Sequence, residues 1–215
     1  MKNIFTKLSL GFLIVATTVN LSAQKIDPKA KSILDAVATS YKNKDNVYFK
    51  FIYGTGNSKK VTKTEPGIFY AAKDQYKLKI MGTEQIFDGN KIYNISEEDQ
   101  EVTVAKPTGS ETMFSPLNYI EQYKKGYTVN YIGKLTVNGV KTDYIKLIPV
   151  QKTGVKEVNL YINAPKKQIV KIEQFGTDNS VSVIAVSGYK ENQNLSSSMF
   201  RFNKDDYKNY FITEL

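Results

Sequence analysis

The sequence predicts a mainly β (α+β) fold in which antiparallel strands form a barrel or a strongly curved sheet. Turn signals recur about every 8–12 residues between runs of alternating apolar and polar residues, which is typical of such folds. We count roughly nine to eleven of these runs, and a single sheet of that size tends to curl. Two further segments have the apolar spacing of helices.

The chain begins with a segment typical of a secretory signal peptide. Lys2 and Lys7 precede an apolar stretch, residues 8–19, and small residues follow up to Ala23. The stretch is short for a membrane span. We therefore predict that residues 1–23 are removed and that residues 24–215 form one exported domain; an uncleaved N-terminal anchor is the alternative. Because the chain has no cysteine, no disulfide can support the fold.

The first predicted helix covers residues 27–42. Asp27 can cap it, and Pro28 is tolerated in the first turn. One apolar stripe follows at helical spacing and should lie on an apolar surface; it consists of Ala30, Ile33, Leu34, Val37, Ala38 and Tyr41.

Strands follow this helix. Alternation predicts strands over residues 47–53 and 76–80, with a turn at residues 54–58 after the first. Asp88 and Gly89 separate two apolar runs and predict a hairpin. An acidic tip at residues 97–101 precedes one more strand.

A second, short helix is predicted over residues 115–126. Ser115 is its cap, Pro116 its first residue and Gly126 its stop signal. Its apolar side would consist of Leu117, Tyr119, Ile120 and Tyr123.

The remaining strands are separated by three predicted turns. Asn138 and Gly139 suit a type I′ turn. Further turns are expected at residues 163–167 and 176–179. The aromatic tail, residues 199–215, should pack against the sheet.

The composition excludes several kinds of chemistry. Without histidine and cysteine, the chain has no Ser-His or Cys-His nucleophile and no imidazole or thiolate metal ligand. The acidic tip lacks the pattern of a calcium loop, and we interpret it as solvated. A carboxylate pair of Glu173 and Asp178 remains conceivable. We expect no enzyme activity, no cofactor and no metal.

The formal net charge of +9 comes from lysines, since Arg201 is the only arginine. Nucleic-acid readers depend on arginine for bidentate contacts, so no nucleic-acid partner is expected. Dispersed lysines favour a solvated surface over a binding patch for anionic membranes or acidic partners.

Five segments in order resemble the outer-membrane lipoprotein carrier family, the LolA-like proteins, in the version found in Bacteroidetes-type bacteria. They read GIFYAAKDQYKLKI, EQIFDGNKIYNISEEDQEVTV, GYTVNYIGKLTVNGVKTDYIKLIPV, YINAPKKQIVKIEQF and MFRFNKDDY. The resemblance covers nearly all of residues 24–215. It implies an unclosed antiparallel β-barrel with helices as a lid over an apolar cavity.

The resemblance also implies a function. Such a protein is a monomeric periplasmic chaperone that takes acylated lipoproteins from an inner-membrane lipoprotein-releasing transporter and passes them to an outer-membrane acceptor. The alternative on the same scaffold is a lipid- or glycolipid-binding protein, or a sensor of the cell envelope, because a fold does not fix a function.

The alternating apolar residues then become candidates for the site. The expected lipid-binding wall is Phe49, Phe51, Tyr53, Phe69, Tyr76, Leu78, Ile80, Ile86, Tyr93 and Ile95. The expected lid residues are Ile33, Leu34, Val37, Leu117 and Ile120. Lys73 matches the position of a lid-closing arginine in proteobacterial members, and lysine lacks the planar fork of arginine.

Overall fold

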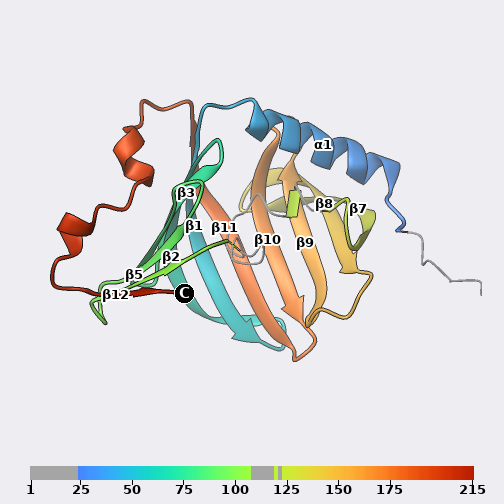
Figure 1. Ribbon diagram of the computed structural model, residues 1–215. Helices are drawn as coiled ribbons and strands as arrows, with labels where there is room; N and C mark the ends of the chain where they lie inside the picture. Colours follow the sequence, from blue (N-terminus) through green and yellow to red (C-terminus); the bar gives the residue numbers. More distant parts are fainter. Residues whose placement is uncertain (1–23, 108–118, 121–122) are drawn as a thin grey trace, which may run out of the picture.

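The computed structural model describes residues 24–107, 119–120 and 123–215 (Figure 1). The predicted signal peptide, residues 1–23, and the predicted start of the second helix with Leu117 lie outside the described residues. Within the described part of the chain, no helix is long and apolar enough to cross a membrane.

The first helix, α1 (Pro28–Lys42), is the one predicted. The Asp27 carboxylate caps it by accepting hydrogen bonds from the backbone N–H groups of Lys29, at 2.8 Å, and Ala30, at 3.0 Å. Its buried residues are Ala30, Leu34, Val37 and Tyr41, which belong to the apolar stripe that the sequence indicated.

The strands form one open, 12-stranded sheet in the order β12-β6-β5-β4-β3-β2-β1-β11-β10-β9-β8-β7. All neighbours are antiparallel except β12 and β6. The bounds are β1 (Val47–Asn57), β2 (Lys60–Ala72), β3 (Gln75–Ile80), β4 (Thr83–Phe87), β5 (Ile92–Ser96), β6 (Glu101–Ala105), β7 (Tyr127–Val137), β8 (Val140–Pro149), β9 (Val155–Asn163), β10 (Gln168–Gly176), β11 (Ser180–Glu191) and β12 (Phe211–Glu214).

The predicted hairpin turns at Asp88-Gly89 and Asn138-Gly139 are confirmed. The Asp88 carboxylate accepts hydrogen bonds from the backbone of Asn90 and Lys91, both at 2.8 Å. Asn138 and Gly139 both have positive φ, 49° and 77°, as a type I′ turn requires.

The predicted turn at residues 54–58 is wrong, because β1 continues through both of its glycines to Asn57. A Cβ on Gly54 would lie 2.8 Å from the Val61 side chain, and one on Gly56 would lie 1.9 Å from the Lys60 carbonyl oxygen. These glycines therefore allow a close approach of β2. The chain instead reverses direction directly after β1, at Ser58 and Lys59.

The two faces of the sheet carry separate apolar clusters. The larger cluster joins α1 to the inner face of β1–β3 and β7–β11. The smaller one lies on the outer face of β4–β6. It is covered by the C-terminal segment, which consists of two 3₁₀ helices, η1 (Ser197–Phe200) and η2 (Lys204–Tyr207), and β12. The tail thus packs against the sheet, as predicted.

Candidate functional site

Half of the inner face is an aromatic wall on β1, β2 and β3. Strand register places Phe49 opposite Phe69, and Phe69 opposite Leu78, so these side chains share one face. The ring centroids of Phe49 and Phe69 are 6.2 Å apart, and those of Phe69 and Tyr76 are 5.8 Å apart. Phe51 lies on the same face. All five residues are buried on the inner face, and their role as a lipid-binding wall stays a prediction.

The other half of the inner face is aliphatic, and the sequence reasoning did not select it. Its buried residues are Ile145, Leu147, Val158, Leu160, Ile162, Ile172 and Ile184. Register brings Ile145 opposite Leu160, and Leu160 opposite Ile172. The alternation of Ile145 and Leu147 in β8 could have revealed this half, since it repeats the pattern of Tyr76 and Leu78 in β3.

Helix α1 covers this apolar face with its own apolar stripe. Leu34 and Val37 are fully buried, and the Tyr41 ring meets the Phe49 ring edge-on with a centroid distance of 5.8 Å. The Tyr41 hydroxyl accepts a hydrogen bond from the Ile169 backbone N–H at 3.0 Å. Ile33 is half-buried against the same cluster. The inner face is therefore occupied by the protein's own side chains.

A glycine allows the wall to pack this closely. Gly67 of β2 lies opposite Phe51 of β1, and a Cβ on Gly67 would be 2.4 Å from Cζ of the Phe51 ring. The ring therefore fills the space that any other side chain at this position would need.

A polar cluster fastens α1 to the segment that precedes β7. Asp35 accepts a hydrogen bond from the Tyr123 hydroxyl at 2.8 Å and forms ion pairs with Lys124 and Lys31, both at 2.6 Å. Burial opposes ionisation of Asp35, but the bonds from these three partners outweigh it and lower its pKa. Tyr123 and Ile120 are themselves buried in the main cluster, so these two residues of the second predicted helix pack against the inner face.

The end of the inner face near residues 53 and 80 is less covered than its centre. Tyr53 and Ile80 are half-buried there and pack against the main cluster. Tyr119 also borders the cluster; its hydroxyl donates to Gln174 Oε1, and burial raises the pKa of Tyr119 to about 12. Side chains in this region can be altered with less damage to the core than those beneath α1.

Three expected wall residues lie on the other side of the sheet. Ile86 pairs with Lys77, which is the neighbour of Tyr76 and Leu78 and points to the opposite face from them. Tyr93 pairs with Ile86, and Ile95 follows at the same parity. The prediction that Ile86, Tyr93 and Ile95 share a wall with β3 is therefore wrong.

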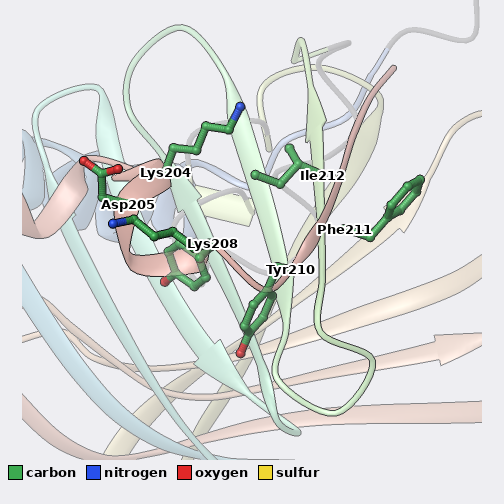
Figure 2. A pocket seen from close by; sticks show the side chains of 7 residues that line it. Lys204, Asp205, Lys208, Tyr210, Phe211 and Ile212 are labelled. Carbon is green, nitrogen blue, oxygen red and sulfur yellow. The ribbon is translucent and has the colours of Figure 1, made fainter.

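These three residues belong to the outer cluster beneath the C-terminal segment. The Tyr93 ring stacks on Phe202 at 4.7 Å, and Ile86 and Ile95 are buried in the same cluster. A cavity of about 380 Å³ beside them is lined by residues of the C-terminal segment alone, among them Lys204, Tyr210 and Ile212 (Figure 2). Side chains alternate between the two faces of a strand, so an error of one residue assigns every side chain of that strand to the wrong face. This error was made for β4 relative to β3.

Lys73 lies in the β2–β3 turn with a positive φ of 51° and an exposed side chain. It borders a cavity of about 310 Å³ together with Tyr41 and Lys42 at the end of α1. Within the described residues, no side-chain hydrogen bond or ion pair joins Lys73 to α1. The bonds that do fasten the helix come from Asp35 and Tyr41 instead, and the lid-closing role of Lys73 stays a prediction.

Three of the acidic residues that could have supported other chemistry have local partners. Glu97 of the acidic tip pairs with Lys79 at 2.8 Å. Glu173 accepts a hydrogen bond from Tyr161 at 2.7 Å, whereas Asp178 is bonded within its own turn to Ser180. Among the described residues, no group of three or more acidic side chains is arranged to hold a metal ion.

No family model matches the chain, and no curated protein matches it. Solved structures do. An uncharacterized conserved protein from Thermus thermophilus superposes with a TM-score of 0.61 at 12% identity, covering 87% of this chain and 99% of that one. The two proteins share a fold. It is the open sheet with a helix that the resemblance to the LolA-like proteins implied.

Two more distant structures are similar over a comparable share of the chain. Mycobacterium tuberculosis lipoprotein LppX has a TM-score of 0.49 at 12% identity, covering 80% of this chain and 99% of that one. A LolA superfamily protein from Nitrosomonas europaea has a TM-score of 0.43 at 11% identity, covering 80% of this chain and 97% of that one.

Proposed function

We propose that the protein is a periplasmic carrier that binds the acyl chains of lipoproteins between its inner face and α1. One observation carries the proposal: a continuous apolar face of an open sheet is covered by the amphipathic helix α1. An open sheet with a separate covering helix can expose its apolar surface without unfolding.

The apolar side chains of α1 and a bound acyl chain would gain comparable free energies from lying on the inner face. Moving α1 away would expose Leu34, Val37 and Tyr41, at a cost of roughly 5–9 kcal/mol. An acyl chain of about 14 methylenes that takes their place contributes roughly 11 kcal/mol. Binding and release are then close to balanced, so cargo can pass to a tighter acceptor without any chemical step. For this reason we also propose that the protein is not an enzyme and needs no cofactor.

The partners follow from this role. The cargo is an acylated lipoprotein, the donor is an inner-membrane transporter that releases lipoproteins, and the receiver is an acceptor at the outer membrane. The resemblance to the Bacteroidetes-type LolA-like proteins supports these assignments, as does the shared architecture.

Native mass spectrometry of protein purified gently from the cells that make it tests the proposal. We expect a population that is heavier by the mass of an acylated protein. Added masses of free phospholipid or glycolipid only would instead favour the lipid-binding or sensing alternative. Protein that never carries a lipid or a lipoprotein would contradict both.

A further inference from the structure

Three turns meet at one end of the sheet and form a continuous edge. The Ser58 N–H donates to the Asn179 carbonyl at 2.9 Å, which joins the β1–β2 turn to the β10–β11 turn. The Thr177 N–H donates to the Gly154 carbonyl at 2.8 Å, which joins the β10–β11 turn to the β8–β9 loop. We call residues 57–61, 150–156 and 176–180 the turn rim. Its β1–β2 and β10–β11 turns lie at the lower edge of the view in Figure 1.

The turn rim is basic. Lys59, Lys60, Lys152 and Lys156 are all exposed on it, and Asp178 is its one acidic residue, which leaves an excess of three positive charges. The Asp178 carboxylate is already engaged by the Ser180 hydroxyl at 2.6 Å and the Ser180 N–H at 2.9 Å. The four lysines form no ion pair with a carboxylate of the described residues.

The turn rim also exposes aliphatic side chains among these lysines. Val61 is 41% exposed and Val150 is 42% exposed. Apolar side chains on protruding turns can enter the boundary layer of a bilayer without disturbing the fold.

Three turns at the opposite end of the sheet differ. In the β2–β3 turn Asp74 accompanies Lys73, and in the β4–β5 turn Asp88 accompanies Lys91, so positive and negative charges balance. The β9–β10 turn carries Lys166 and Lys167, but no large apolar side chain is exposed in residues 163–168. Lysines and exposed aliphatic residues thus coincide in the turn rim and not in this turn.

We propose that the turn rim docks onto an anionic lipid bilayer. Lysine amines near such a surface are attracted to its phosphates, and their methylene stems can lie in the headgroup layer. Val61 and Val150 would enter the boundary between headgroups and acyl chains. Separate apolar tips suit a soft surface of this kind better than the flat, closely packed patch of a stable protein interface. The inference goes beyond the proposed cargo and holds for either kind of ligand.

Vesicle flotation tests this inference, with phosphatidylcholine vesicles that contain or lack phosphatidylglycerol. The protein purified from the cells that make it is compared with a rim variant, Lys59→Gln/Lys60→Gln/Lys152→Gln. The matched control is Lys141→Gln/Lys166→Gln/Lys167→Gln, which removes the same charge from exposed lysines at the opposite end. Lys59 and Lys167 both have positive φ, 65° and 53°, so backbone strain is matched as well.

We expect binding to the anionic vesicles only, weakened roughly 10- to 100-fold by the rim variant and by salt, and much less by the control. A second variant, Val61→Ser/Val150→Ser, should weaken binding but keep its salt dependence. If the rim and control variants lost vesicle binding equally, net charge alone would explain the binding, and the proposal would be overturned. Absence of binding, or capture of an acidic protein through the turn rim without vesicle binding, would overturn it too.

Discussion

The Tyr123 hydroxyl donates a hydrogen bond to the Asp35 carboxylate at 2.8 Å, and this bond joins the segment before β7 to the middle of α1. Lys124 and Lys31 complete the cluster around the same carboxylate. Because α1 covers the apolar inner face, these bonds contribute to the force that holds the cover in place. These bonds also respond to pH.

Asp35 gives a pH dependence whose sign can be worked out. Its pKa is lower in the folded protein than the ordinary value of 3.8, so the ionised form is preferred in the folded state. The stabilisation is therefore complete above about pH 4 and declines as the pH falls below that value toward the folded-state pKa. In Asp35→Asn, the free energy of unfolding should decrease less as the pH is lowered through this range. Urea unfolding at several pH values measures this dependence. Asp99→Asn, at the acidic tip, is the control; an unchanged slope in Asp35→Asn would contradict the prediction.

A second prediction concerns the contact of Gly67 with Phe51. Gly67→Ala would place a Cβ 2.4 Å from the Phe51 ring, so either the ring or the strand must move. We expect a loss of about 1–3 kcal/mol in the free energy of unfolding. The double variant Gly67→Ala/Phe51→Leu should lose less than the two single changes together, because the smaller side chain relieves the overlap. Strict additivity of the two changes would show that they do not meet.

The sequence predicts those parts of the molecule that local patterns determine. The cap at Asp27, the stripe on α1 and the turn at Asn138-Gly139 follow from residues that are adjacent or one helical turn apart. The alternation in β3 likewise places Tyr76 and Leu78 on one face.

What the sequence could not predict depends on the register between strands. The alternation within β4 and β5 was recognised, but nothing local tells whether Ile86 lies on the same face as Leu78. The glycines of β1 gave a misleading turn signal, since Gly56 serves a close approach of β2 rather than a reversal. The bond between Asp35 and Tyr123 joins residues 88 positions apart, and no pattern in the sequence pairs them.

The two faces of the sheet allow a matched test of acyl-chain binding. Ile80→Glu puts a charge at the less covered end of the inner face, whereas Ile52→Glu puts one on the outer face, where Ile52 is already 39% exposed. Binding of a fluorescent fatty acid, measured by titration, should fall at least roughly tenfold in Ile80→Glu, because a charge in an apolar site is costly. It should be nearly unchanged in Ile52→Glu. The converse result would place the acyl chain on the outer face.

The outer cluster should contribute to stability and not to acyl-chain binding. The Phe202 ring stacks on Tyr93 at 4.7 Å and on Tyr207 at 5.1 Å, so Phe202→Ala removes the centre of the contact between the C-terminal segment and β5. Phe202 is only half-buried, and we expect a loss of about 1–3 kcal/mol, below the usual cost for a fully buried phenylalanine. Thermal unfolding measures this loss, and the fatty-acid titration should give the same dissociation constant as for the unchanged protein, since Tyr93 faces away from the inner wall. A weaker fatty-acid affinity in the folded variant would mean that the C-terminal segment takes part in the site.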